Sequence, residues 1–479
     1  MQRLSSLDAQ FLAAEHGNSG SHYCGMAIYQ TGDQKPITAA TMRRRLAERM
    51  GHCPPLRWKL VTVPFGLDRP VFVDSDVNLG DHVSETTLAA PVDETTLAAE
   101  VAAILSTPLD RDKPLWKLQV FHGLPGCTAV VMTLHHAAAD GIAAGEIFAT
   151  LLDWPDETSP AHTGGHAGSV PSRAPSRAAL AARGIASIPG RRVRALRAAP
   201  GALAHLDQVP ILRSLPGAHE LSQIVRGDLS AKRLDAPRTR FNAKLSAARS
   251  VAFGTVSLSD VKAIKNAMGV TVNDVVIALC AGVLRRRLTS TGDLPADPLV
   301  AYIPVSTRLP DAQDRYGNAI SSIIAPIPTH LSDAHERVAY AHETLARAKR
   351  RAREAPPTLM SDVNDPIPVP IFGIAARGLM ELVSSRFVRP PVNLIISNVT
   401  GSPVKFACYG APLVAHYPLS LVFDGFTLNI TVVSYEQGLD IGIVGDAETL
   451  PDAWDLMDDF HHELAELTAS LTTKGSTDS

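Results

Sequence analysis

Residues 133–145, TLHHAAADGIAAG, decide how this chain is interpreted. They continue an almost wholly apolar run, which predicts a strand over residues 127–136 in the centre of a sheet. Two adjacent histidines, His135 and His136, stand where this strand ends, and Asp140 and Gly141 follow three alanines later. Small side chains let another group approach closely, and Gly141 would permit a turn that a bulkier residue resists. The pattern predicts a reactive group displayed in a channel.

Three interpretations of the histidine pair stay open at this point. We expect no metal, because neighbours on a strand point to opposite faces and no HExxH or CxxC pattern adds further ligands. In the second interpretation, both histidines are core residues that hydrogen-bond to the backbone, which is common in proteins. This interpretation does not explain the three alanines and the Asp-Gly pair that follow. The third interpretation is general-base catalysis, because a neutral imidazole takes a proton from a hydroxyl near pH 7. The chain has no GxSxG nucleophile motif, so the alcohol itself would attack an activated acyl group.

The overall composition excludes some classes of protein. The chain has 479 residues, of which 45% are hydrophobic, and this favours more than one core. Its net charge of −3 argues against nucleic-acid binding. Its five cysteines are dispersed, as in proteins with reduced thiols. The first residues lack the pattern of a signal peptide, and no apolar run reaches the roughly 20 residues of a membrane span. These features predict a cytoplasmic protein.

Patterns along the chain predict three regions. Residues 1–154 form an α/β lobe that carries HHAAADG, residues 155–248 form a Pro/Gly/Arg-rich crossover linker with helices, and residues 249–479 form a second α/β lobe. Asp93 is the expected N-cap of a helix in the first lobe, and Ser259 that of a helix in the second that stops at Gly269. The crossover has no acidic residue between Glu157 and Asp207.

Several motifs together resemble the wax ester synthase/diacylglycerol acyltransferase family. HHAAADG matches the HHxxxDG signature of that family, although condensation domains of peptide synthetases share it. The other matching segments are LSSLDAQFLAAE near the start, Pro114-Leu115-Trp116, Asn273-Asp274, IPVSTR with Arg308, Gly317-Asn318 and IISNVTGSP. The resemblance implies an α/β fold of two chloramphenicol acetyltransferase-like lobes, with mixed sheets flanked by helices, a crossover linker and a tunnel between the lobes.

The resemblance also implies roles for individual residues. His136 would be the base, with His135 in support, and Asp140 would hold structure by pairing with Arg308. Asn273 would donate its amide to the oxyanion of the tetrahedral intermediate, although a residue in a first helical turn also serves as an ordinary cap. The remaining candidates support the site: Gly141, Asp274, Ser397 and Asn398.

The expected function is acyl-CoA-dependent O-acyl transfer, giving triacylglycerol from diacylglycerol, wax esters from long-chain alcohols, or both. Long-chain acyl-CoA would be a co-substrate, and no bound cofactor is expected. Two alternatives are a catalytically weak paralogue that binds neutral lipid and an acyltransferase acting on another lipid alcohol. The segment SHYCG at residues 21–25 departs from the family pattern, which leaves the substrate preference open.

Lipid substrates raise the question of membrane contact. The basic crossover and the apolar segment at residues 369–387 are candidates for peripheral contact with the inner membrane face or with lipid droplets. A solvated helix and a buried helix explain the same patterns equally well.

Overall fold

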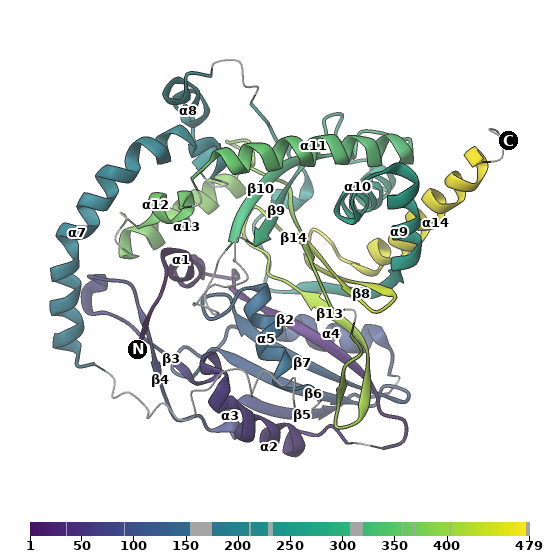
Figure 1. Ribbon diagram of the computed structural model, residues 1–479, viewed down its shortest axis with the longest axis horizontal. Helices are drawn as coiled ribbons and strands as arrows, with labels where there is room; N and C mark the ends of the chain where they lie inside the picture. Colours follow the sequence, from purple (N-terminus) through teal and green to yellow (C-terminus); the bar gives the residue numbers. More distant parts are fainter. Residues whose placement is uncertain are drawn as a thin grey trace.

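Two six-stranded sheets form the centre of the protein in the computed structural model (Figure 1). The structure describes residues 1–475, with gaps at 35, 91, 154–174, 210–211, 229–232, 307–319, 357, 366, 368 and 403. Both sheets mix parallel and antiparallel pairs. The predicted α/β fold of two lobes with mixed sheets and flanking helices is therefore confirmed.

The first sheet has the strand order β12-β13-β2-β7-β6-β5. Its strands are β2 (His22–Gln30), β5 (Val83–Thr87), β6 (Trp116–His122), β7 (Cys127–His135), β12 (Ala407–Cys408) and β13 (Ala411–Leu419). The helices of this lobe are α1 (Ser6–Ala14), α2 (Ala39–Arg49), α3 (Leu79–His82), α4 (Glu94–Leu105) and α5 (Gly141–Ala149). A small sheet of β1 (Gln2–Arg3), β4 (Val71–Asp74) and β3 (Trp58–Val61) lies beside them. Strand β7 is buried at nearly every position, as expected for a central strand.

The second sheet has the order β10-β9-β11-β14-β15-β8. Its strands are β8 (Arg249–Ser257), β9 (Leu299–Ser306), β10 (Ile320–Ile327), β11 (Leu394–Val399), β14 (Leu428–Tyr435) and β15 (Gly438–Asp446). The helices around it are α9 (Leu258–Met268), α10 (Val272–Ser290), α11 (Ala334–Glu354), α12 (Leu359–Asn364), α13 (Val369–Ser384) and α14 (Trp454–Gly475). Helix α10 is buried along most of its length, so it packs in the largest hydrophobic core.

Strands β12 and β13 cross from the second half of the chain into the first sheet. Strand β13 pairs antiparallel with β2, and Figure 1 shows it running down beside that strand. The predicted boundary assigns residues 249–479 to the second lobe. Strands β12 and β13 do not fit this boundary, because they belong to the first sheet. Strands from both halves of the chain therefore pair within the first sheet.

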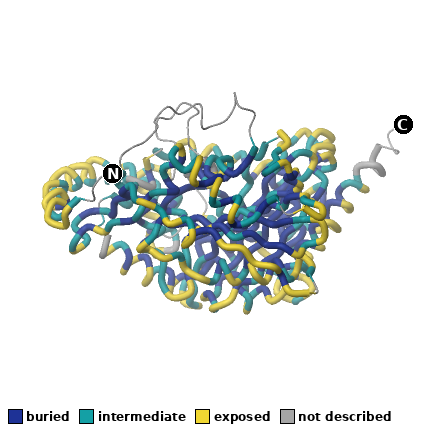
Figure 2. The backbone as a smooth tube through the Cα atoms, turned by 90° about the horizontal axis from the view of Figure 1, so that it is seen from below, coloured by how far each residue is buried: buried dark blue, intermediate teal, exposed yellow. Residues whose placement is uncertain are grey.

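The described part of the crossover is mainly helical. Helix α7 (Arg177–Ala204) contains Pro189 and Pro200 and runs along one side of the molecule, and α8 (Ala218–Arg226) projects at its end (Figure 1). Figure 2 shows that α7 is largely exposed, in contrast to the buried strands at the centre. The first part of the crossover, residues 154–174, lies outside the described residues.

Helix boundaries mostly follow the predicted caps. Asp93 caps α4 by accepting a hydrogen bond from the Thr96 amide, as predicted, and Gly269 ends α9 with a φ of +66°. The N-cap of α9 is Ser257 rather than Ser259, because the Ser257 hydroxyl accepts from the Asp260 amide. Which of the two serines caps the helix depends on where the preceding strand ends. The local sequence pattern does not show this.

In the described part of the chain, no single helix is long and apolar enough to cross a membrane. Helices α9 and α10 reach that length and composition together, but the chain bends by 108° between them.

Candidate active site

The motif histidines lie where β7 ends, near the centre of the molecule. His135 is the last residue of β7 and pairs with His22 of β2, whereas His136 begins a turn. The His136 amide donates to the Ser21 carbonyl at 2.8 Å. The end of the strand therefore separates the two side chains, so each imidazole has its own surroundings.

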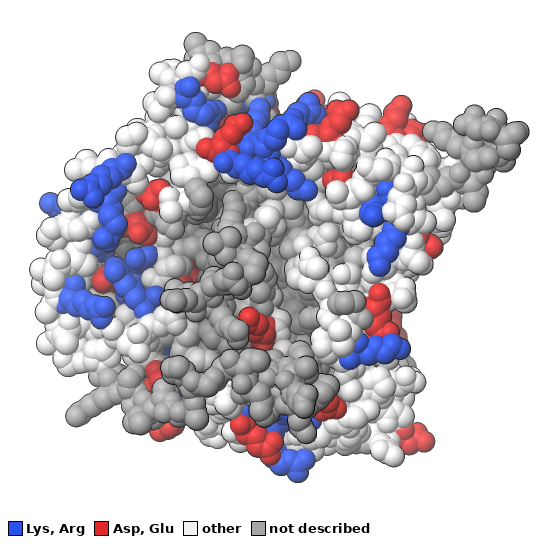
Figure 3. Space-filling view, viewed as in Figure 1, with Lys and Arg blue, Asp and Glu red and all other residues white. Residues whose placement is uncertain are grey.

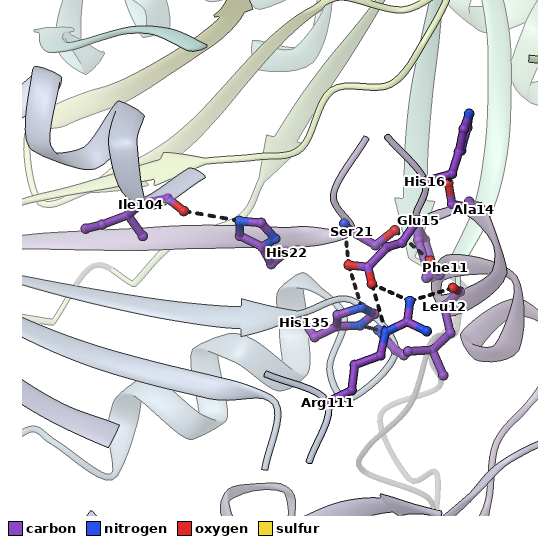
Figure 4. Close-up of polar contacts among 11 residues, drawn as sticks. Phe11, Leu12, Ala14, Glu15, His16, Ser21, His22, Ile104, Arg111 and His135 are labelled. Atoms are coloured by element: carbon purple, nitrogen blue, oxygen red, sulfur yellow. Dashed lines mark hydrogen bonds and ion pairs between the residues drawn. The ribbon is translucent and has the colours of Figure 1, made fainter. Parts of the chain in front are cut away.

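The His135 imidazole is buried and both of its nitrogens are engaged (Figure 4). Its Nδ1 accepts a hydrogen bond from the Ala137 amide at 2.9 Å, and its Nε2 lies 3.1 Å from a carboxylate oxygen of Glu15. Since Nδ1 accepts, the proton is on Nε2 and is donated to Glu15. The contacts hold His135 as a neutral imidazole in one tautomer.

Glu15, directly after α1, connects His135 to the rest of the first lobe. Its carboxylate also pairs with Arg111 and accepts from the Ser21 amide at 3.0 Å. Burial raises the pKa of Glu15, but the bonds from His135, Arg111 and Ser21 outweigh it and bring the pKa to about 2. A carboxylate that stays ionised fixes the orientation of His135 throughout the neutral pH range.

The His136 ring lies between two aromatic side chains and is half-buried. It stacks on Phe11 of α1, with centroids 4.4 Å apart and planes at 17°, and lies 4.8 Å from the Tyr23 ring. The Tyr23 hydroxyl donates to the Ala139 carbonyl at 3.1 Å, which anchors that ring against the motif loop. These contacts fix the position of the His136 ring against α1 and β2.

Asp140 and Gly141 form the start of α5. Asp140 is buried and its carboxylate caps the helix by accepting from the Ala143 amide at 2.9 Å. Gly141 has no left-handed backbone angle, so the expectation that it supplies a special turn is wrong. A Cβ built on Gly141 meets no described atom within 4 Å, and the residue leaves open space at the helix start.

Two of the predicted site residues, Asn273 on α10 and Asn398 on β11, are hydrogen-bonded to each other. The Asn398 amide on β11 donates to the Asn273 Oδ1 in the first turn of α10 at 3.2 Å. Ser397 precedes Asn398 on β11 and is half-buried. Within the described residues, neither asparagine bonds to a motif histidine.

Asp274 has the contacts of a helix cap. It forms a capping box with Thr271, and its carboxylate lies 2.8 Å from His342 Nδ1 of α11. Burial raises the pKa of Asp274. The hydrogen bonds from His342 and Thr271 lower it by a larger amount, so the pKa lies below its usual value. Arg308, Gly317 and Asn318 lie outside the described residues.

Sequence reasoning missed the side chains that surround the histidines. These are Phe11, Glu15, Tyr23 and Arg111. Glu15 lies 120 residues before His135 in the chain, and no spacing rule connects them. The only signal was LSSLDAQFLAAE, the opening segment that matches the family, since it contains Phe11 and ends on Glu15.

The fold and the motif define a two-lobed acyl-transferring class of protein, and comparisons with known proteins agree. The sequence profile of the wax ester synthase/diacylglycerol acyltransferase catalytic domain matches residues 4–276, and that of the family's C-terminal domain matches residues 316–468. The chain belongs to this family and is an acyltransferase.

Individual relatives cover almost the whole chain. A Mycobacterium tuberculosis H37Rv protein with a provisional name as a diacylglycerol O-acyltransferase is 33% identical over 98% of this chain and 90% of its own length. The solved wax ester synthase/diacylglycerol acyltransferase from Marinobacter aquaeolei VT8 is 25% identical, covers 98% of this chain and 100% of its own, and has a TM-score of 0.69.

The fold is also shared with a condensation domain. The first condensation domain of the calcium-dependent antibiotic synthetase has a TM-score of 0.54 at 15% identity, over 98% of this chain and 96% of its own. This likeness concerns the fold alone.

Proposed function

We propose that the chain transfers the acyl group of a long-chain acyl-CoA to the hydroxyl of diacylglycerol or a long-chain alcohol, with His136 as the general base. As the hydroxyl oxygen attacks the thioester carbonyl carbon, His136 takes the hydroxyl proton. Collapse of the tetrahedral intermediate breaks the C–S bond, and the proton passes to the departing thiolate. No covalent acyl-enzyme and no bound cofactor are needed.

The observation that carries this proposal is that both nitrogens of the neighbouring His135 are occupied. His135 has Nδ1 occupied by an amide hydrogen and Nε2–H held by Glu15, so neither nitrogen is free to take a proton. His136 is half-buried between Phe11 and Tyr23, at the start of the motif loop. A base must reach the substrate hydroxyl, and this arrangement favours His136.

Asn273 is the candidate donor to the oxyanion. Its Oδ1 accepts from Asn398, so its own amide hydrogens point away from that bond and are able to donate. Asp140 keeps the motif loop attached to α5, and the predicted pairing of Asp140 with Arg308 remains part of the proposal.

The test is the release of free coenzyme A from palmitoyl-CoA, with dioleoylglycerol or hexadecanol as the acceptor. We expect acceptor-dependent release by the wild type and its loss in His136→Ala, by about 10²–10⁴-fold for an oriented base. The better acceptor would identify the product. If folded wild-type protein releases no coenzyme A with either acceptor, the transferase proposal fails, and the lipid-binding paralogue or a different lipid alcohol replaces it.

We also propose that helices α7, α8 and α13 contact a membrane surface or a lipid droplet. Helix α7 carries six arginines and no acidic residue, and Figure 3 shows Lys and Arg side chains gathered along it and again near α8 and α11. Large apolar side chains are exposed among these charges, including Leu196, Ile224 and Ile374 at 77%, 67% and 67%. Exposed basic and apolar groups on the same helices support attachment to anionic lipid.

A further inference from the structure

The imidazole of His416, on β13, has no hydrogen-bond partner among the residues that the structure describes. Its backbone amide donates to Asp440 at 2.8 Å, and its ring stacks on Phe148 of α5 with centroids 4.8 Å apart. Within the described part of the chain, neither ring nitrogen of His416 makes a hydrogen bond. A polar group in such surroundings is expensive to leave unsatisfied.

Part of the His416 side chain remains accessible. The side chain of His416 is half-buried, yet burial alone lowers its pKa to about 4. Gly25 of β2, which lies beside this ring, is half-buried as well, so both residues keep accessible surface on the same side of the first sheet. At neutral pH the ring is uncharged and offers one N–H donor and one nitrogen acceptor.

His416 and His136 approach the same face of β2. In the strand register His416 lies opposite Ala27, which shares a face with Gly25 and Tyr23. A Cβ on Gly25 would lie 3.1 Å from His416 Nε2, so the glycine makes room for the ring. Tyr23, about 7 Å further along the strand, touches the His136 ring.

The helix α5 covers the same region. Gly141, Gly145 and Phe148 fall on one stripe of α5 at helical spacing. A Cβ on Gly141 or Gly145 would meet no described atom within 4 Å, whereas Phe148 packs against His416. Both glycines are exposed, so this stripe of α5 keeps accessible surface near the motif and ends at Phe148, against His416.

We propose that His416 hydrogen-bonds a second polar group of the acceptor while the acceptor hydroxyl lies at His136, and thereby selects diacylglycerol over simple long-chain alcohols. This inference rests on the proposed function. Diacylglycerol carries ester carbonyls a few atoms from its free hydroxyl, and one of them would accept from the His416 N–H. Hexadecanol has only methylene groups there and would leave His416 unpaired. A site that holds a buried polar group discriminates against substrates that lack its partner.

The test compares acceptors in steady-state kinetics at a fixed palmitoyl-CoA concentration. For His416→Leu we expect the ratio of kcat/KM for dioleoylglycerol to that for hexadecanol to fall about tenfold, the effect of one hydrogen bond. His416→Gln should recover part of the ratio, because its amide donates. Val414→Ala, an exposed change on the same strand, should leave the ratio unchanged. A folded, active His416→Leu enzyme with an unchanged ratio would overturn the inference.

A binding measurement separates this inference from the proposed function. In ¹⁵N-histidine-labelled His136→Ala protein, the His416 imidazole resonance should shift when dioleoylglycerol is added in detergent micelles. Hexadecanol micelles and empty micelles should leave it in place. Wild-type protein that is inactive with both acceptors would count against the proposed function alone, whereas an unmoved His416 resonance would count against acceptor binding by this residue.

Discussion

At the scale of single residues, the site depends on Glu15 as much as on the motif. Its carboxylate receives the Nε2–H of His135 and pairs with Arg111, so it determines which tautomer His135 adopts. The position of the histidines at a strand end was predictable, because a continuous apolar run precedes them. The contact with Glu15 was not, because it joins a helix end to a strand end through the tertiary fold alone.

Glu15→Gln should lower the stability of the protein near pH 7 and reduce the dependence of stability on pH. The pKa of Glu15 falls from 4.5 to about 2 on folding. A depressed carboxyl pKa stabilises the folded state above the unfolded pKa, and this contribution is lost as the pH falls from about 4.5 through 2. The contribution is on the order of 3 kcal/mol at neutral pH.

Urea unfolding of the wild type and Glu15→Gln at several pH values between 7 and 3 measures this effect. The difference in unfolding free energy should be largest at pH 7 and shrink toward pH 3. Glu48→Gln, a change on the exposed side of α2, is the matched control. A difference that stays constant with pH would show that the Glu15 carboxylate does not stabilise the fold by its charge.

At the scale of elements, the helices of the crossover and α13 differ from the core helices in what they expose. Helix α8 exposes Leu221, Ile224 and Val225, whereas α10 buries nearly all of its apolar residues. The sequence predicted a basic, partly helical crossover. It could not show which apolar side chains stay exposed, because exposure depends on what packs against each helix.

Leu196→Glu combined with Ile224→Glu should weaken attachment to anionic vesicles. The two side chains are 77% and 67% exposed, so the changes should leave the fold intact while adding charge to the lipid-facing surface. Co-sedimentation with phosphatidylcholine vesicles containing phosphatidylglycerol measures the attachment, and Val404→Glu, 60% exposed beside β12, is the control. Equal sedimentation of all three proteins would exclude α7 and α8 as the attachment surface.

At the scale of the whole molecule, β13 joins the two lobes. Its nine residues belong to the second half of the sequence but pair with β2 of the first lobe. This pairing places His416 on the sheet that carries the motif. The two-lobe arrangement followed from the strand and helix patterns and from the family motifs. Strand β13 escaped prediction because Pro412 and Pro418 argue against a strand. In the structure Pro412 lies opposite Ala407 of the two-residue strand β12, and Pro418 lies opposite Gly25 of β2.

The candidate active site combines residues from distant parts of the chain. Helix α1 supplies Phe11, and the residue after it, Glu15, holds His135. The end of β7 supplies both motif histidines, and β11 and α10 bring Asn398 and Asn273 together. In the mechanism that we propose, His135 maintains the geometry and His136 carries out the proton transfer.

The most direct test of that division compares kcat for palmitoyl transfer in His136→Gln and His135→Gln at saturating substrate concentrations. We predict a loss of about 10²–10⁴-fold for His136→Gln, because the base is removed. For His135→Gln we predict a loss of about tenfold, because a positioning hydrogen bond is weakened while the base remains. A loss in His135→Gln equal to or greater than that in His136→Gln would contradict the account.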